Sequence, residues 1–146
     1  MAGNRPKSYT YHTSLEWRDG RAGQMASGDK LAFRVASPPE FRGEAGVWSP
    51  EDLFVASANA CTMTTFLAFA ERQALEVLSY TSDAEGLLEL VERGFRFTRI
   101  TLRPVIQVDA AQVESARQVM HEAHSKCLIS RSMACEVVVE TTVTAG

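Results

Sequence analysis

The sequence lacks the features that mark membrane-spanning, secreted and nucleic-acid-binding proteins. No apolar run approaches the roughly 18 residues that are needed to cross a bilayer. The first residues, MAGNRPKSYTYH, contain no apolar stretch after their basic side chains, so we expect no signal peptide. The formal net charge is -3, whereas nucleic-acid binding usually requires a basic excess. We therefore expect a cytoplasmic protein without a membrane or nucleic-acid partner.

Cysteine is also scarce, because the chain contains only three: Cys61, Cys127 and Cys135. An odd number without a secretion signal argues against a disulfide scaffold. In a reducing compartment such cysteines are buried apolar residues, metal ligands or reactive thiols. The sequence also has no phosphate-binding loop, dinucleotide fingerprint or nucleophile elbow. Its chemistry therefore depends on which of those three roles each cysteine has.

The 146 residues are 45% hydrophobic, which is enough for a folded core and excludes wholesale disorder. No repeat or linker divides them, so we predict one domain over residues 1–146. A half-buried strand is predicted over residues 9–17, where side chains alternate between apolar and polar. Asp19-Gly20 is a strong hairpin-turn signal, and another strand is predicted over residues 31–35. Residues 37–48 lack periodicity, which predicts a long surface loop.

A long helix is predicted over residues 50–74. Ser49 fits the N-cap, Pro50 fits the first helical position, and Ser-x-x-Asp resembles a capping box that ends at Asp52. The apolar residues of this helix leave no clear polar face, which predicts burial on most sides.

Strands are predicted over residues 77–90 and 95–108, with a turn at residues 92–94 between them. Asp109 then fits the N-cap of a second helix over residues 110–125, with Gln112 in the capping-box position. A short turn is expected after Cys127, and a last strand is predicted over residues 133–143. This order predicts an α+β fold in which helices pack on antiparallel sheet around a long buried helix.

Cys61 lies in the middle of the predicted long helix, among small apolar residues. A cysteine in such a position is most often an inert core residue. Reactivity requires a nearby cation, and on this helix the nearest arginine on the C-terminal side, Arg72, is three turns away. An activating arginine must therefore come from elsewhere in the fold.

The other cysteines allow further interpretations. His121, His124 and Cys127 are spaced at i, i+3 and i+6, so a zinc site with Cys61 as fourth ligand is conceivable, although this is not a standard zinc spacing. Histidines near a helix C-terminus are more often surface groups that the helix dipole stabilises, and we predict no metal. Cys135 falls on the apolar face of the last predicted strand, which favours core packing.

The segment Ser49-Pro-Glu-Asp-Leu-Phe-Val-Ala-Ser-Ala-Asn-Ala-Cys61 resembles the core motif of the OsmC/Ohr family of peroxide-reducing proteins. In that family a Pro-Glu-x-Leu-Phe segment opens a long helix, and an Ala-Cys pair follows about ten residues later. A second cysteine lies roughly sixty-five residues on, in a Cys-x-x-Ser setting that is here Cys127-Leu-Ile-Ser130. The Arg18-Asp-Gly turn is similar to the arginine-bearing hairpin of the organic hydroperoxide branch. Leu128 and Thr62 depart from that branch, which usually has proline and an aromatic residue there.

The resemblance implies an OsmC-like fold, an intertwined homodimer with its sites at the subunit interface, and a thiol-dependent peroxidase activity. Cys61 would be the peroxidatic thiolate and Cys127 the resolving cysteine. Arg18 would stabilise the thiolate and polarise the peroxide, while Glu51 would hold that arginine. The implied substrate is an organic hydroperoxide, and the reductant is an external thiol or dithiol such as dihydrolipoamide. No metal, flavin or haem is implied.

The distance between Glu51 and Cys61 can be derived from helix geometry alone. Glu51 and Cys61 are ten residues apart on one predicted helix, which corresponds to about 15 Å of rise. An arginine could hardly bridge that distance, so a Glu51 that serves Cys61 is expected to come from a second chain. The identity of the arginine stays open among Arg18, Arg21 and Arg42, with Arg131 near Cys127 as a further candidate.

Two other functions remain open beside the peroxidase. The first is an OsmC-like redox-sensing or small-molecule-binding protein with little turnover. The second is a metal-binding module that uses Cys61, His124 and Cys127. Apolar residues near Cys61 in the sequence are candidates for an approach path that favours organic peroxides; these are Trp48, Phe54, Met63 and Phe66.

Overall fold

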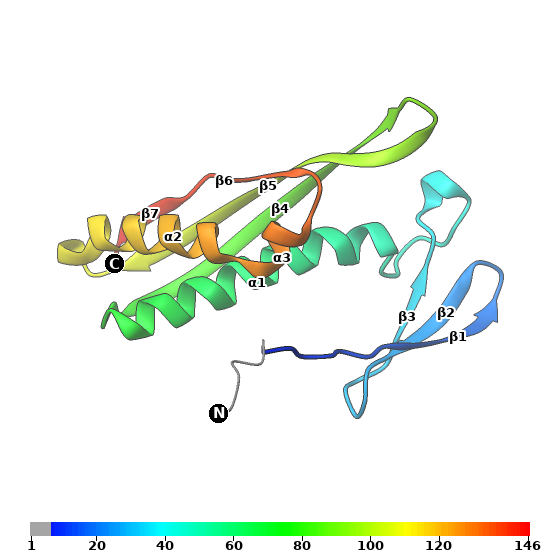
Figure 1. Cartoon of the computed structure of the whole chain (residues 1–146), viewed down its shortest axis with the longest axis horizontal. Helices are drawn as coiled ribbons and strands as arrows, with labels where there is room; N and C mark the ends of the chain where they lie inside the picture. Colours follow the sequence, from blue (N-terminus) through cyan, green and yellow to red (C-terminus); the bar gives the residue numbers. More distant parts are fainter. Residues whose placement is uncertain (1–6) are drawn as a thin grey trace, which may run out of the picture. The chain divides into compact units, whose positions relative to one another are not determined.

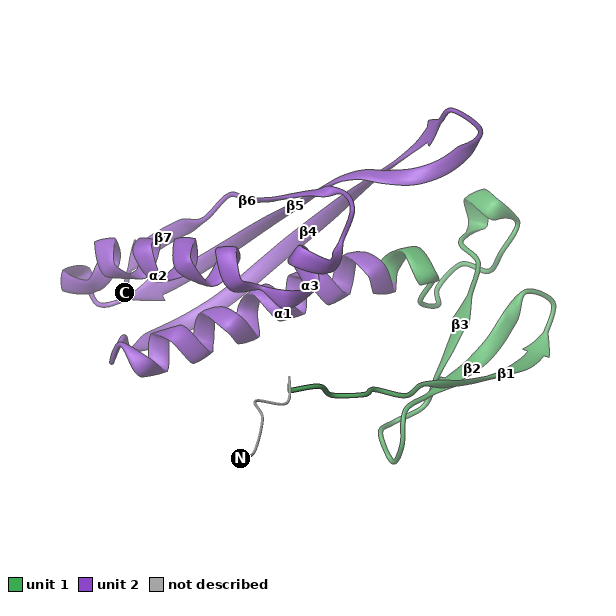
Figure 2. Cartoon of the chain, in the orientation of Figure 1, with its two compact units in different colours: residues 1–52 green, residues 53–146 purple. Residues whose placement is uncertain are grey.

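A computed structural model describes residues 7–146. Residues 1–6 lie outside the described residues. They are half of the segment, residues 1–12, on which the expectation of no signal peptide depends. The chain divides into two compact units, Met1–Asp52 and Leu53–Gly146, which Figure 2 shows in different colours. The single domain over residues 1–146 stays a prediction.

The first unit contains an antiparallel sheet of three strands: β1 (Ser14–Asp19), β2 (Ala22–Ala26) and β3 (Phe33–Ala36). The predicted Asp19-Gly20 hairpin turn is confirmed, and Gly20 has a φ of 48°, which glycine adopts without strain. The predicted strand over residues 9–17 begins later, at Ser14, and the expected half-burial is wrong for the described chain. All six residues of β1 are exposed, since neither face of this hairpin arm is covered within its unit. β2 was not predicted as a separate strand.

The predicted irregular loop is confirmed, although it contains one short 3-10 helix, η1 (Pro39–Phe41). An arginine fixes this loop to the sheet: Arg34 forms ion pairs of 2.7 Å with both Asp19 and Glu44. The hydrogen bond from Arg34 lowers the pKa of Asp19.

The long helix α1 (Pro50–Arg72) starts as predicted. Asp52 N–H donates to Ser49 Oγ at 3.1 Å, and Ser49 N–H donates to the Asp52 carboxylate at 3.0 Å, which is a complete capping box. The expectation of burial on most sides is wrong within the described chain. Fully buried residues occur only at every fourth position, so a single stripe of α1 faces the core; its members are Ala58, Thr62, Phe66 and Ala70.

The expectation that no apolar stretch is long enough to span a bilayer is also wrong for α1. An 18-residue window of this helix has a mean hydropathy of 1.5, so α1 is long and apolar enough to cross a membrane by length and composition. The core helix of a soluble protein passes the same test.

The second unit is built on the long strands β4 (Val77–Val91) and β5 (Gly94–Val108), which pair antiparallel through the predicted turn. The predicted last strand is divided into β6 (Glu136–Val139) and β7 (Thr142–Ala145), and both pair parallel with β5 rather than antiparallel. The break lies opposite Arg103 and Pro104 of β5. Proline has no N–H for the ladder, which accounts for the interruption.

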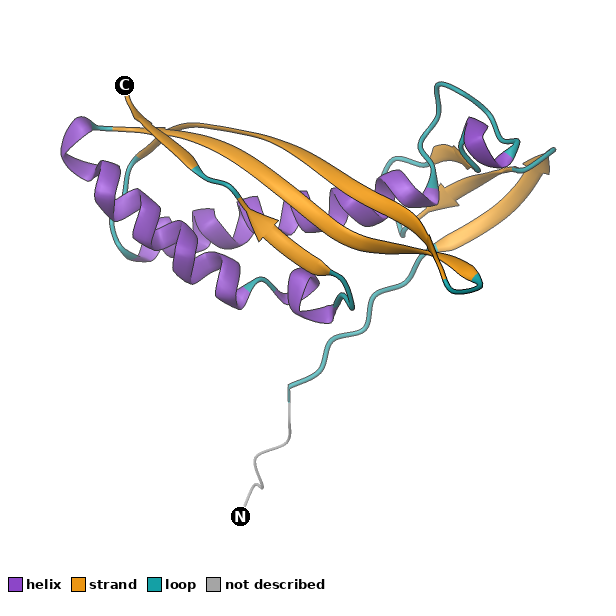
Figure 3. Cartoon of the chain, turned by 90° about the horizontal axis from the view of Figure 1, so that it is seen from above, coloured by secondary structure: helices purple, strands orange, loops and turns teal. Residues whose placement is uncertain are grey.

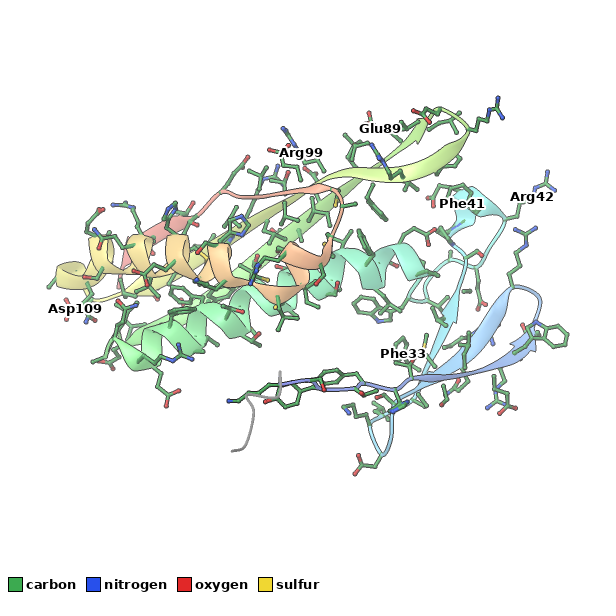
Figure 4. All side chains as sticks on the ribbon, in the orientation of Figure 1. Phe33, Phe41, Arg42, Glu89, Arg99 and Asp109 are labelled. Atoms are coloured by element: carbon green, nitrogen blue, oxygen red, sulfur yellow. The ribbon has the colours of Figure 1, made fainter. Side chains whose placement is uncertain are left out.

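Two helices connect β5 to β6 and make the parallel pairing possible. Asp109 caps this region as predicted, by accepting a hydrogen bond from Ala111 N–H at 3.2 Å, and Figure 4 shows it beside α2. The side chain of Gln112 does not complete a capping box, because it donates to the carbonyl of Ala74. A 3-10 turn, η2 (Ala110–Gln112), leads into α2 (Val113–Lys126). The turn expected after Cys127 is a short helix, α3 (Leu128–Ser132).

The core of the second unit lies between the sheet and the two long helices. Figures 1 and 3 show α1 and α2 running along the four-stranded sheet. One buried cluster joins the sheet to both helices, with Phe66 of α1, Ile106 of β5 and Met120 of α2. A smaller cluster contains Ala58, Ile100 and Leu102. The predicted α+β fold is therefore confirmed, with the parallel edge as its main difference.

Candidate active site

Cys61 lies on α1, one residue before the buried stripe position Thr62. Its side chain is half-buried, and its Sγ lies 3.7 Å from Thr65 Oγ1, one helical turn later. This thiol therefore lies at the border of the core, where a reactant can approach it.

Cys127 lies at the junction of α2 and α3 and is fully buried. Its extended backbone, with φ -61° and ψ 112°, ends α2 and begins α3. The carbonyl of Cys127 accepts a hydrogen bond from Arg131 N–H at 3.1 Å, which fixes the short helix to this residue. As a result, the side chain of Ser130 is held on the same side as the sulfur.

Two hydroxyl groups converge on the Cys127 sulfur. Ser130 Oγ donates to Cys127 Sγ at 3.4 Å, and Thr62 Oγ1 donates to the same atom at 3.9 Å. Thr62 comes from α1 and Ser130 from α3, so the sulfur joins two elements that are far apart in sequence. Thr62 is only 1% exposed, which makes this contact inaccessible to water.

The pKa of Cys127 is set by opposing effects. Burial raises it, but hydrogen bonds from the side chain and backbone of Ser130, and from the side chains of Cys61 and Thr62, together lower it below the ordinary value of a thiol. The structure thus brings Cys61 close enough to Cys127 to affect the pKa of the buried thiol. Such a pair can form a disulfide.

The sequence alone indicates no functional role for Thr62. Thr62 was noted only as a departure from an aromatic residue, whereas the structure makes it the contact between α1 and Cys127. The four-residue spacing of the stripe on α1 indicates only that Thr62 faces inward with Cys61 at the edge of the stripe, and it does not identify Cys127 as the partner.

Glu51 and the candidate arginines lie in the first unit, apart from Arg131. Glu51 Oε1 is buried and has no hydrogen-bond partner among residues 7–146. Arg18 forms an ion pair of 3.0 Å with Glu16 on its own strand. Arg21 donates to the carbonyl of Phe41 at 2.8 Å and lines a cavity of about 480 Å³ within the first unit.

Arg42 extends outward in Figure 4, and Arg131 of α3 is exposed. The choice of arginine therefore stays a prediction.

Three of the remaining candidate residues belong to the core. Cys135 is partly buried and packs against the smaller core cluster, which agrees with the core packing that we expected. Phe66 is fully buried, and Phe54 stacks on Phe97 with ring centroids 4.9 Å apart, so both belong to the core rather than to an approach path.

The alternative metal site is not assembled. Within residues 7–146, no group of three or more His, Cys, Asp or Glu side chains is arranged to hold a metal ion.

The chain is similar to known proteins along most of its length. A family model described as OsmC-like protein matches residues 43–142, a range that contains both Cys61 and Cys127. The uncharacterized protein YmaD of Bacillus subtilis is 28% identical over 129 residues, which are 84% of this chain and 85% of YmaD.

Solved structures agree with that match. An OsmC-like protein of unknown function from Vibrio cholerae has a TM-score of 0.83 at 24% identity, covering 92% of this chain and 99% of that one. An organic hydroperoxide resistance protein from Legionella pneumophila has a TM-score of 0.74 at 26% identity, covering 95% of this chain and 99% of that one. The fold described above is thus shared along nearly the whole chain.

Proposed function

This chain belongs to the OsmC-like protein family, and on that premise we propose that it is a thiol-dependent peroxidase that reduces organic hydroperoxides to alcohols. The observation that carries the proposal is a half-buried thiol, Cys61, close enough to the fully buried Cys127 to affect its pKa, with hydroxyl groups that stabilise a negative charge on the buried sulfur. The likeness to an organic hydroperoxide resistance protein supports the substrate class.

The reaction begins with a thiolate at Cys61. An arginine beside this sulfur, with Arg18 as the leading candidate, would stabilise the thiolate. The Cys61 thiolate then attacks the terminal peroxide oxygen, the O–O bond breaks, and the alkoxide takes up a proton and leaves as an alcohol. Cys61 is oxidised by two electrons to a sulfenic acid.

The second half of the reaction uses Cys127. Its thiolate attacks the Cys61 sulfur, the S–O bond breaks, and hydroxide leaves as water after protonation, which forms the Cys61–Cys127 disulfide. An external dithiol such as dihydrolipoamide then reduces the disulfide. This scheme uses no metal or bound cofactor, and we propose that it operates in the cytoplasm, where thiols are kept reduced.

We further propose that a second copy of the chain completes the site in a homodimer. The buried Oε1 of Glu51, which has no hydrogen-bond partner in the described part of the chain, is suited to accept a guanidinium hydrogen bond, for which Arg18 is the leading candidate. Apolar residues that a single chain leaves exposed support the same arrangement, since Leu15 and Trp17 are 63% and 74% exposed.

The activity is tested by the consumption of tert-butyl hydroperoxide in the presence of dihydrolipoamide. Cys61→Ser should abolish consumption, and Cys127→Ser should allow one turnover and then stall or require another thiol. Cys135→Ser is the matched control and should keep normal activity. A folded protein without Cys61-dependent turnover would contradict the proposal and favour a redox-sensing or binding protein.

The composite site is tested by subunit mixing. Cys61→Ser and Glu51→Ala are each expected to be inactive or nearly so. If Glu51 acts across the interface, mixed dimers contain one intact site, so an equimolar mixture should regain about a quarter of the normal activity. A mixture that stays inactive although the chains exchange, or a monomer at micromolar concentration, would contradict the composite site.

A further inference from the structure

The two thiols of the candidate site differ in their access to solvent. Cys61 is partly exposed, whereas Cys127 is 0% exposed. Thr62, the residue that follows Cys61 on α1, is 1% exposed, and its Oγ1 lies 3.9 Å from the Cys127 sulfur. A reagent that arrives from solvent can therefore reach Cys61 but not Cys127. A hydroperoxide must reach Cys61 in the proposed reaction, so the same path is open to a reductant.

The backbone of Cys127 is held on both sides. Its N–H donates to the carbonyl of His124 at 3.4 Å, and its carbonyl accepts a hydrogen bond from Arg131 N–H at 3.1 Å. These bonds fix the residue at the junction of α2 and α3. We therefore expect the Cys127 sulfur to stay buried when it is joined to Cys61 in a disulfide.

The surroundings of Cys127 favour its release as a thiolate. Ser130 Oγ donates to its sulfur at 3.4 Å, and Thr62 Oγ1 donates at 3.9 Å. Burial raises the pKa of Cys127, but the hydrogen bonds, with those from Ser130 as the largest effect, lower it below the ordinary value. In thiol–disulfide exchange a sulfur of lower pKa leaves faster. Access and leaving-group stability thus favour the same direction of bond cleavage.

We propose that the external dithiol attacks the Cys61 sulfur of the disulfide and releases Cys127, with Thr62 and Ser130 as the residues that stabilise the leaving thiolate. This inference rests on the proposed function and specifies its last step.

The step proceeds through a mixed disulfide on Cys61. One thiolate of the dithiol forms a bond to the Cys61 sulfur, the Cys61–Cys127 bond breaks, and its electron pair leaves with Cys127. The second thiolate of the dithiol then attacks the dithiol sulfur that is bound to Cys61, which releases Cys61 as a thiolate and the dithiol as a cyclic disulfide. The dithiol is oxidised by two electrons, the protein disulfide is reduced by two, and the two protons of the dithiol pass to the cysteines or to solvent.

The site of attack is tested in full-length Cys135→Ser, which keeps only Cys61 and Cys127. The protein is oxidised to the disulfide with diamide, so no peroxide is needed, and is then mixed with 2-mercaptoethanol as the probe. Acid stops the exchange at early times, and peptide mass spectrometry locates the bound probe. We expect the probe on Cys61 at least about tenfold more often than on Cys127, because access decides which sulfur is attacked.

The leaving group is tested by the rate at which dihydrolipoamide reduces the diamide-formed disulfide. Thr62→Val keeps the shape of the side chain but removes its hydroxyl, and it should slow reduction about two- to threefold at every pH, because the attacking thiol is unchanged. Thr62→Ser keeps a hydroxyl and should restore the rate. Thr64→Val is the matched control, since the exposed Thr64 donates to the carbonyl of Cys61 at 3.1 Å rather than to Cys127.

The outcomes separate this inference from the peroxidase proposal. A probe found on Cys127, or on both cysteines equally, would overturn the inference and leave the peroxidase proposal intact. An unchanged rate in Thr62→Val would remove Thr62 as a stabilising residue and would also count against Cys127 as the leaving group. A protein that forms no Cys61–Cys127 disulfide with diamide would contradict both.

Discussion

Ser130 donates the shorter of the two hydroxyl hydrogen bonds to Cys127, at 3.4 Å, so Ser130→Ala tests how this contact sets the reactivity of the pair. The substitution removes one stabilising donor from a thiolate that is otherwise desolvated. The pKa of Cys127 should therefore rise, because burial raises it and Ser130 supplies the largest opposing effect.

The effect on rate can be derived from general magnitudes. A hydrogen bond to a charged group contributes about 1.5 kcal/mol at the lower end of its range, which is about a tenfold change in thiolate fraction. A more basic thiolate is also a better nucleophile, by about threefold for this change, since the Brønsted coefficient is about 0.4–0.5. At neutral pH, disulfide formation in Ser130→Ala should thus be about three- to fourfold slower. At a pH where both proteins are fully thiolate, the variant should be about threefold faster.

Quenched-flow mass spectrometry measures this step directly, by following conversion of the Cys61 sulfenic acid to the disulfide after one equivalent of tert-butyl hydroperoxide. Ser132→Ala is the matched control, since Ser132 lies on the same short helix and donates to the carbonyl of Leu128 at 2.7 Å. Crossing pH profiles are the signature of an electrostatic role for Ser130. The same loss of rate at every pH would refute the reasoning and assign Ser130 to packing alone.

Three further predictions concern the fold. Phe66→Ala should destabilise the protein by about 3–5 kcal/mol in urea unfolding because it leaves a cavity in the core, whereas Leu90→Ala, at a site that is 67% exposed, should cost less than about 0.5 kcal/mol. The raised pKa of Tyr80 means that its stabilising effect is complete below pH 10.0 and lost as the pH rises to about 12, so Tyr80→Phe should flatten this part of the stability–pH curve. The lowered pKa of Asp19 implies stability that is present above pH 3.8 and lost in acid; Arg34→Leu should raise that pKa in an NMR titration, and an unchanged value would contradict the ion pair.

The sequence predicted the elements whose signals are local. The capping box at Ser49 and the turn between β4 and β5 depend on neighbouring residues, and both are present in the structure. The class of fold followed from the order of these elements. The family followed from motifs with a defined spacing around Cys61 and Cys127.

The structure differs from the sequence predictions where residues that are distant in the sequence determine the local structure. The last strand is divided because Pro104, more than thirty residues earlier, interrupts the edge with which it pairs. The burial of α1 was overestimated because composition does not reveal how many neighbours a helix has. The contact of Thr62 with Cys127 joins residues 65 positions apart, and no local pattern contains that information.

The two edges of β5 become paired at different stages of synthesis. One edge pairs with β4, which precedes it on the chain, so this hairpin can form as soon as both strands have left the ribosome. The other edge pairs with β6 and β7, which follow β5 on the chain only after α2 and α3. Until then the nascent chain carries an unpaired strand edge, a surface on which other chains aggregate. A chain that stops before residue 136 lacks both strands and would leave that edge open permanently.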